Sequence, residues 1–167
     1  MQRVLIIGSG GAGKSTLATT LGERLGLPVV HLDAHYWRPG WDPTPSDEWR
    51  RRVSELIAAH AWVMDGNYGG TMAQRLAAAD TVVLLDLPRL LCLWRIVRRA
   101  VTYAGRSRPD MAPGCPERWQ WAFVWWILSY PQTRLPGVLS RLAALPSETR
   151  VVRLRSTREV EAFVSSL

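Results

Sequence analysis

The sequence predicts an α/β protein built on a five-stranded parallel sheet with helices on both faces. Short apolar segments rich in β-branched residues alternate along the chain with segments whose apolar residues recur at helical spacing. Strands that are joined through helices pair in parallel, and the helices cover both sides of the sheet. The 167 residues are expected to form one domain, 1–167. The strands are expected near residues 3–7, 28–32, 61–65, 80–86 and 150–154.

Composition narrows the class of protein. Hydrophobic residues make up 47% of the chain, as in globular domains. No apolar run reaches the roughly 18 residues of a transmembrane helix, and the N-terminus shows no signal-peptide pattern. Cys92 and Cys115 are too few for a disulfide framework or a metal cluster. A cytoplasmic protein with no membrane partner is therefore expected, as a monomer or a homodimer.

The chain is strongly basic, with a net charge of +7 and a pI near 10.4. Such a charge fits a nucleic-acid surface, a membrane surface or an active site that handles anions. Charge alone does not separate these three, so the placement of the basic residues has to decide.

The first strand leads into Gly8-Ser9-Gly10-Gly11-Ala12-Gly13-Lys14-Ser15, and a helix with leucines at helical spacing follows. Strand, glycine loop, Lys-Ser and helix is the order of a phosphate-binding P-loop. Glycines let backbone N–H groups turn inward, and the helix N-terminus adds its positive end. The residues expected to hold nucleotide phosphates are Gly8, Gly10, Gly11, Ala12, Gly13, Lys14, Ser15 and Thr16.

Lys14 supports this interpretation, because it is the only lysine among 21 basic residues. A compact ammonium fits between phosphates in a way that a planar guanidinium does not. One alternative is a dinucleotide-binding fingerprint, since Gly8-x-Gly10-x-x-Gly13 fits it and Asp33 lies about 20 residues further on. That fingerprint does not need Lys14-Ser15, and the chain is short for a dinucleotide domain plus a substrate domain.

The second strand ends at Asp33, and a loop rich in aromatic residues follows over 34–45. Three prolines and a glycine in this loop predict that it lacks regular structure. Loops at the carboxyl ends of strands form the binding crevice of open α/β sheets. The loop is thus either a substrate-binding loop or a cover in which Trp37 and Trp41 close the core. The candidate substrate-binding residues are Asp33, Tyr36, Trp37, Arg38, Asn67 and Arg75.

The third strand ends in Asp65-Gly66, beside the predicted P-loop. An acid at this position can hold Mg²⁺ together with the Ser15 hydroxyl, as a Walker-B carboxylate does. The alternative is a simple Asp-Gly turn. We therefore expect Ser15 and Asp65 to be the metal-binding pair.

Arginines gather in the second half of the chain. A helix from Arg89 to about Tyr103 carries Arg95 and Arg99 one turn apart, and the aperiodic segment 104–116 carries Arg106 and Arg108. Arginine forks bind phosphate oxygens in pairs, so 104–116 is a candidate lid that closes over phosphates. The next expected helix, 117–130, is rich in tryptophan. Its aromatic stripe is interpreted as core packing, with a dimer interface or a base-stacking platform as alternatives.

These motifs, in this order, resemble the P-loop nucleoside monophosphate kinases, of which adenylate kinase is the familiar member. Leu85-Asp86-Leu87-Pro88 is similar to the family's Leu-Asp-x-Pro, and Arg95 and Arg99 are similar to its Arg-x-x-x-Arg. The resemblance implies strand order 2-3-1-4-5, ATP and Mg²⁺ as cofactors, and a small lid that contains Arg106 and Arg108.

A closer resemblance is to bacterial adenylate-kinase-related proteins labelled DNA topology modulation proteins, and it covers nearly the full length. It is carried by His31-Leu32-Asp33, Asp65-Gly66-Asn67-Tyr68, Arg108-Pro109-Asp110-Met111 and Gly114 to Arg118. The chain departs from the monophosphate kinases after Asp65-Gly66, where Asn67-Tyr68-Gly69 replaces an aromatic residue, a proline and an arginine. Asp33 looks more like the substrate-binding carboxylate of shikimate-type kinases.

The leading hypothesis is an ATP- and Mg²⁺-dependent kinase of a small molecule, and the expected phosphate acceptor is a nucleotide or a nucleoside. The alternatives are a nucleotide-responsive DNA- or RNA-binding regulator, a hydroxy-acid or sugar kinase of shikimate or gluconate type, and an ATPase or GTPase switch. Nucleic acid is a possible partner but is not favoured over a small phosphate acceptor. The candidate catalytic residues are Lys14, Asp33, Arg95, Arg99, Arg106 and Arg108.

Overall fold

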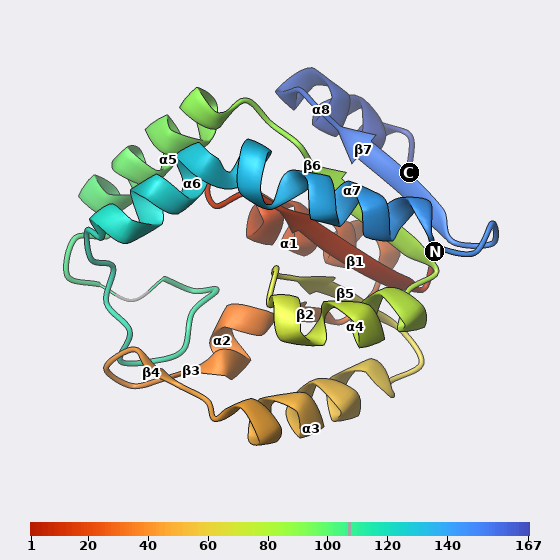
Figure 1. The fold of residues 1–167 in the computed structure, drawn as a ribbon, viewed down its shortest axis with the longest axis horizontal. Helices are drawn as coiled ribbons and strands as arrows, with labels where there is room; N and C mark the ends of the chain where they lie inside the picture. The colour runs from red at the N-terminus through yellow and green to blue at the C-terminus, as the bar shows by residue number, and fades with distance from the viewer. Residues whose placement is uncertain (107) are drawn as a thin grey trace.

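The computed structural model describes residues 1–106 and 108–167, and it contains the predicted parallel sheet. The strands are β1 (Arg3–Gly8), β2 (Val29–His31), β5 (Trp62–Asp65), β6 (Thr81–Leu85) and β7 (Arg150–Leu154). They lie in the order β2-β5-β1-β6-β7, with every neighbouring pair parallel (Figure 1). Counted along the chain this is the order 2-3-1-4-5, so the predicted topology is confirmed.

Helices cover both faces of the sheet because the central strands are apolar on both sides. In β1, Val4 and Ile6 pack on one side and Leu5 and Ile7 on the other, and all four side chains are fully buried. Such alternation is expected for a parallel strand between two helical layers. The principal helices are α1 (Lys14–Leu25), α3 (Ser46–Ile57), α4 (Met72–Ala78), α5 (Arg89–Thr102), α6 (Trp121–Thr133), α7 (Leu135–Ala143) and α8 (Thr157–Ser165).

The two layers are made by different helices. Apolar residues of α1, α5 and α8 pack with Val4 and Ile6, whereas those of α3, α4 and α7 pack with Leu5 and Ile7. The last helix begins with a capping box, in which the Ser156 hydroxyl accepts from the Glu159 amide at 3.2 Å. Within residues 1–106 and 108–167, no helix combines the length and the apolar character needed to cross a membrane.

The aromatic loop after β2 is more regular than predicted. It forms the short helix α2 (Leu32–Tyr36) and an antiparallel hairpin of β3 (Trp37–Arg38) and β4 (Asp42–Pro43). The prediction of an irregular loop was wrong because Pro39 lies in the turn between the two strands, while Pro43 and Pro45 lie at and beyond the end of β4. Trp41, with φ of 65°, makes the turn. The hairpin is tied to the 104–116 segment, since the Gly40 amide donates to the Gly114 carbonyl oxygen at 2.8 Å.

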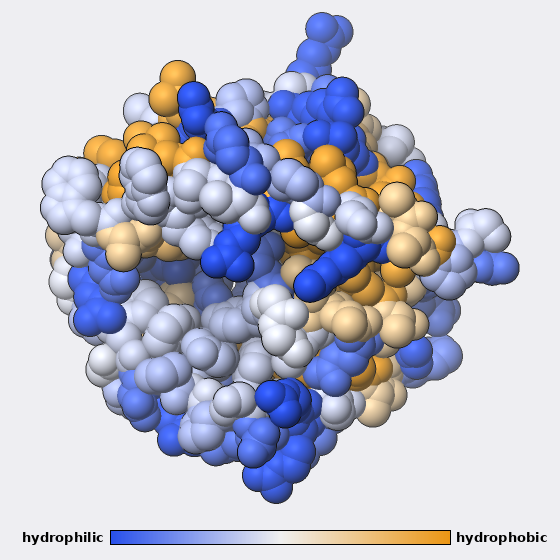
Figure 2. Space-filling model, viewed as in Figure 1, coloured by the Kyte–Doolittle hydropathy of each residue, from blue (hydrophilic) through white to orange (hydrophobic). Residues whose placement is uncertain are grey.

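The tryptophan-rich helix differs from its prediction in position and in packing. It begins at Trp121 rather than Glu117, and it continues through Pro131. Tyr130 is buried, but Trp121 and Trp125 are 74% and 71% exposed. The prediction that the aromatic stripe packs in the core is therefore wrong for Trp121 and Trp125, because α6 buries only the side that faces the sheet and α5. Figure 2 shows apolar residues at the surface over α5 and α6.

Candidate active site

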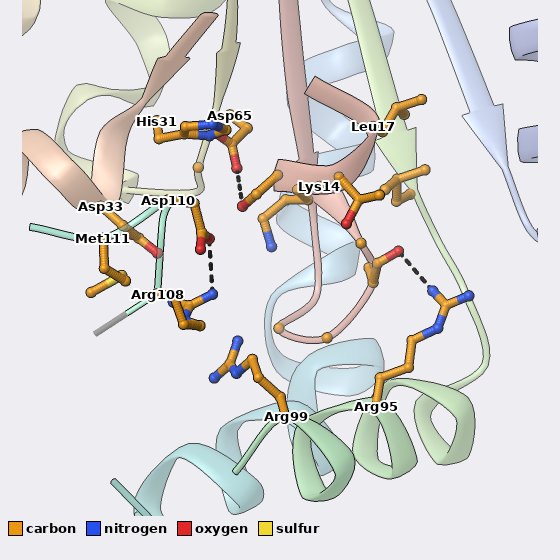
Figure 3. A pocket seen from close by; sticks show the side chains of 18 of the residues that line it. Lys14, Leu17, His31, Asp33, Asp65, Arg95, Arg99, Arg108, Asp110 and Met111 are labelled. Carbon is orange, nitrogen blue, oxygen red and sulfur yellow. Dashed lines mark hydrogen bonds and ion pairs between the residues drawn. The ribbon is translucent and has the colours of Figure 1, made fainter. Parts of the chain in front are cut away.

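A cavity of about 1410 Å³ opens at the carboxyl ends of the strands, where the crevice of an open α/β sheet is expected. The glycine loop after β1, the end of β5, the helix α5 and the hairpin β3–β4 all contribute to its walls. Figure 3 shows Lys14 near the middle, with Asp33, Arg108 and Asp110 gathered on one side and Arg95 on the other. Residues predicted from distant parts of the sequence thus meet in one place.

The glycine loop has the geometry of a phosphate cradle. Gly11 and Gly13 have φ of 74° and 92°, values that L side chains rarely adopt. A Cβ at Gly11 would also collide with the Cys92 carbonyl oxygen. The first helical hydrogen bond runs from the Leu17 amide to the Gly13 carbonyl oxygen at 2.9 Å. The amides of Lys14, Ser15 and Thr16 therefore lie in the helix's first turn, where N–H groups lack helical partners.

Lys14 lies inside this cradle, and its Nζ donates to the Ser9 carbonyl oxygen at 2.9 Å. Burial lowers the pKa of the Lys14 ammonium below its ordinary value, because a charged group loses hydration there, although the nearby Asp65 and Asp33 oppose the shift. Among the described residues, the buried Ser9 Oγ has no hydrogen-bond partner. A cradle with a buried cation and an unpaired hydroxyl fits a bound polyphosphate.

Asp65 joins the loop to the second strand. Its Oδ2 accepts a hydrogen bond from Ser15 Oγ at 2.8 Å, and its Oδ1 lies 2.6 Å from His31 Nδ1. The hydrogen bond to Asp65 raises the pKa of His31. Adjacent strands β2 and β5 make this contact, since His31 and Asp65 are register partners. Ser15 and Asp65 thus lie together as the predicted metal-binding pair, and a hydroxyl beside a carboxylate is a donor set that suits Mg²⁺.

The turn after β5 joins the two ends of the cavity. Asn67 binds the first glycine of the loop twice: its Oδ1 accepts from the Gly8 amide at 3.1 Å, and its Nδ2 donates to the Gly8 carbonyl oxygen at 2.7 Å. The neighbouring Tyr68 donates its hydroxyl to Asp33 Oδ1 at 2.5 Å. The segment Asp65–Tyr68 therefore contacts Ser15, Gly8 and Asp33, which come from three separate elements.

Arg75 does not line the cavity, which corrects the prediction that it binds substrate. It is fully buried, and its guanidinium donates to the carbonyl oxygens of Gly66, Asn67 and Tyr68 at 2.8, 2.6 and 2.9 Å. Burial lowers the pKa of Arg75 to about 10. The residue holds the turn in place because α4, which carries it, starts just after that turn and packs under it.

Three of the predicted arginines reach the cavity. Arg95 donates to the Ala12 carbonyl oxygen at 3.1 Å, so it lies against the glycine loop. Arg99 donates to Glu117 at 2.9 Å, and Arg108 donates to Asp110 at 2.8 Å. The Arg108 Nε also lies 3.0 Å from a Glu117 oxygen, as an ion pair without the alignment of a hydrogen bond.

Three other predicted residues lie outside the cavity walls. Arg106 is exposed, because the chain turns away from the cavity between Tyr103 and Arg106. Arg38 points outward and pairs with Glu48 at 2.6 Å. Tyr36 packs among Trp37, Trp49 and Tyr68 as part of the core. Trp37, Asn67 and Asp33 do line the cavity.

Sequence reasoning missed several wall residues. Glu117 and Asp110 hold the arginines, His31 contacts Asp65, and Trp41 and Tyr68 add aromatic walls. The contact of His31 could have been predicted. The predicted order places the second strand beside the third, so His31 near the end of the second strand lies next to Asp65 at the end of the third. Glu117 stands in the run Gly114 to Arg118 that carries the closer resemblance, but its ion pairs had no signal in the sequence, because its partners are 9 and 18 positions away across an aperiodic segment.

Comparison with known proteins supports the fold. No family model matches the chain. The uncharacterized protein YqaC of Bacillus subtilis (strain 168) is 30% identical over 102 residues, which are 59% of this chain and 56% of YqaC. The match thus spans about half the length of that curated relative.

Solved structures of kinases superpose on nearly the whole chain. A shikimate kinase from Acinetobacter baumannii in complex with shikimate has a TM-score of 0.59 and 19% identity, over 99% of this chain and 90% of that one. A shikimate kinase from Bacteroides thetaiotaomicron has a TM-score of 0.57 and 14% identity, over 99% of this chain and 95% of that one. A gluconokinase from Sinorhizobium meliloti 1021 has a TM-score of 0.51 and 16% identity, over 99% of this chain and 92% of that one. The chain therefore shares its fold with these shikimate kinases and this gluconokinase.

Proposed function

We propose that this protein is an ATP- and Mg²⁺-dependent kinase that transfers a phosphoryl group to a hydroxyl of a small molecule. One observation carries the proposal: the segment Asp65–Tyr68 contacts both Gly8 of the phosphate loop and Asp33 on the far wall of the same cavity. The groups suited to a phosphoryl donor and to an acceptor are thereby held opposite each other. The kinase fold agrees with this arrangement.

The loop residues would bind the donor. The amides from Gly10 to Thr16 and the Lys14 ammonium would hold the β- and γ-phosphates of ATP, and Ser15 with Asp65 would hold Mg²⁺. A Mg²⁺ ion held by these two residues would supply charge neutralisation for the phosphates. The buried position of Lys14 keeps its ammonium in the cavity, where a charge interaction is stronger than in water.

Asp33 would receive the acceptor. The acceptor oxygen forms a bond to the γ-phosphorus, and the bond from that phosphorus to the β–γ bridging oxygen breaks, with its electron pair leaving on ADP. The hydroxyl proton passes to the Asp33 carboxylate, whose other oxygen is oriented by Tyr68. Arg99 and Arg108 would turn from Glu117 and Asp110 toward the transferred group and stabilise its charge. We also propose that the segment 104–116 is a lid that closes over the bound phosphates.

A second candidate is a nucleotide-responsive DNA- or RNA-binding regulator, as the resemblance to the DNA topology modulation proteins suggests. One observation favours it: the exposed Trp121 and Trp125 lie on a basic protein, and bases stack on exposed aromatic rings. Binding to nucleic acid that weakens steeply with salt would support it, whereas weak binding already at low salt would exclude it. The arginines inside the cavity favour the kinase.

The kinase proposal is tested by nucleotide binding and turnover. Calorimetric titration of the purified protein with ATP and Mg²⁺ is expected to show binding that Lys14→Ala weakens by about a hundredfold, because a buried charge contact to phosphate is lost. ADP release in the presence of mixed acceptors should disappear in Asp33→Asn while ATP binding remains. If the protein does not bind ATP, or if Lys14→Ala binds it equally well, the proposal fails. Since Cys92 and Cys115 are buried free thiols, we also propose a reducing, cytoplasmic location.

A further inference from the structure

We infer that the acceptor is an uncharged, hydroxyl-bearing ring held between aromatic walls, rather than a phosphate or a carboxylate compound. The inference rests on the proposed kinase function and specifies the substrate class of the same cavity. It follows from two independent observations: the backbone conformation of two aromatic wall residues, and the state of the arginines around them.

The first observation is that strained backbone lies at the acceptor end of the cavity. In the described chain, the non-glycine residues with positive φ are Trp41, at 65°, and Tyr68, at 26°. Bulky residues rarely adopt such values, because the side chain then crowds the backbone. Both side chains line the cavity. Strain of this kind persists where the surrounding structure holds a side chain in a required place.

Separate contacts hold each of these residues. Trp41 donates its indole Nε1 to the Pro116 carbonyl oxygen at 3.0 Å. Its ring meets the Trp37 ring edge to face, with centroids 5.4 Å apart, and Met111 packs against both. The backbone of Tyr68 is held by Arg75, as described above. The acceptor end therefore has a built aromatic wall, and such walls bind the flat or apolar face of a ring.

The second observation is that the arginines near this wall already have partners. Arg99 and Arg108 share Glu117, and Arg108 also binds Asp110. Arg38 and Arg75, the two arginines among the predicted substrate-binding residues, lie outside the cavity walls. Arg118 also lines the cavity, but it is an exposed residue, and its guanidinium lies over the Trp41 ring, 5.1 Å from the ring centroid.

The charges near the wall therefore disfavour an anionic acceptor. A phosphate or carboxylate on the acceptor would lie near Asp33 and Asp110, while Arg99 and Arg108 serve the transferred phosphoryl group. An anion that loses water without gaining a cation is strongly disfavoured. A neutral ring instead needs only the aromatic wall and the Asp33 carboxylate, which accepts the hydroxyl proton in the transfer described above. Nucleosides and free sugars or cyclitols share this chemistry.

Matched acceptor pairs test the inference. Adenosine, uridine and thymidine are compared with their 5′-monophosphates, and glucose and myo-inositol are compared with shikimate and gluconate, at saturating ATP and Mg²⁺. We expect an uncharged compound to exceed its anionic counterpart at least about tenfold in kcat/KM, because Arg99 and Arg108 already have carboxylate partners and the charge of the exposed Arg118 is screened by water. A preference for nucleosides or for sugars and cyclitols identifies the source of the ring.

Acceptor binding gives a second readout that does not depend on turnover. Quenching of tryptophan fluorescence by the preferred acceptor is expected to weaken about tenfold or more in Trp41→Leu and in Trp37→Leu, since one stacking wall is lost. Trp121→Leu is the matched control, because Trp121 is exposed and lies outside the cavity walls. Circular dichroism shows whether each variant folds, and two wall variants keep the test valid if one does not.

Three results would overturn the inference. These are a preference for monophosphates or carboxylates, a lack of effect of both wall variants, and failure of every uncharged ring to bind while ATP binds normally. Arg118→Gln is expected to retain the preference for uncharged acceptors; a reversal dependent on Arg118 would contradict the inference. Loss of ATP binding is a different outcome, since it would remove the kinase proposal itself.

Discussion

The buried guanidinium of Arg75 donates to the carbonyl oxygen of Tyr68 at 2.9 Å, and Tyr68 in turn donates its hydroxyl to Asp33. An arginine that lies outside the cavity thereby sets the position of a carboxylate inside it. Its partners in the described chain are three carbonyl oxygens rather than a carboxylate, so its charge is stabilised only by their dipoles. This relationship leads to the first prediction.

Replacing Arg75 with methionine should lower the free energy of unfolding by about 2–4 kcal/mol, because buried carbonyl oxygens lose their donors. Urea denaturation measures the change. Arg38→Met is the matched control, since Arg38 makes a surface ion pair with Glu48 that contributes under about 1 kcal/mol. Equal losses in the two variants would show that Arg75 does not hold the turn.

Removing the Asn67 side-chain amide should weaken ATP binding. Asn67→Leu breaks both hydrogen bonds to Gly8, so the start of the phosphate loop is no longer held, and we expect roughly a tenfold increase in the Kd for ATP. Asn67→Asp keeps an acceptor for the Gly8 amide and should give a smaller loss. Calorimetric titration checks both variants; unchanged affinity in Asn67→Leu would contradict the proposed coupling.

A methyl group at Gly11 should abolish nucleotide binding. In Gly11→Ala the Cβ collides with the Cys92 carbonyl oxygen, and the positive φ is disfavoured for alanine. Gly137→Ala is the control, because it adds the same methyl group to the helix α7 at a position where a Cβ has open space. This substitution should stabilise the fold by about 0.5–1 kcal/mol. ATP affinity and thermal unfolding of the two variants are compared. Normal ATP binding by Gly11→Ala would argue against a tight cradle.

Lys14 should titrate below the ordinary lysine value of about 10.4. Since it is the only lysine, reductive methylation with ¹³C-formaldehyde labels one side chain besides the N-terminal amine, and the signal that Lys14→Ala lacks belongs to Lys14. Burial disfavours the ammonium and lowers the pKa, whereas bound phosphates would favour the ammonium and raise it. We therefore expect a low midpoint in the free protein and an upward shift with ATP. A midpoint that ATP does not move would place the phosphates elsewhere.

The strands and the donor half of the site were predictable because local patterns specify them, whereas the strand order was implied by the resemblance to the monophosphate kinases. Apolar β-branched segments specify the strands, and the run Gly8–Ser15 requires its own strand–loop–helix context. Asp65 was predictable for the same reason, as the last residue of the strand next to β1. The aromatic residues were less predictable, because helical spacing shows which side chains share a face but not which face is covered.

The acceptor half depends on contacts between residues far apart in the sequence. Arg75 was predicted in the cavity but lies beneath the turn it supports, and Arg38 was predicted there but pairs with Glu48 on the surface. An arginine has the same appearance in a sequence whether it binds a substrate, a carbonyl oxygen or a carboxylate. Only the packing of the surrounding elements distinguishes these roles.

The sequence by itself determined the strands of the sheet and the pattern of a phosphate-binding loop, because each depends on residues that are neighbours along the chain or at regular spacing, and the order of the strands came through the family resemblance. Only the tertiary structure decided which charges stay free and which aromatic rings line the cavity. Those properties depend on pairs such as Arg99 with Glu117 and Tyr68 with Asp33, which meet only when the helices, the hairpin and the sheet pack together.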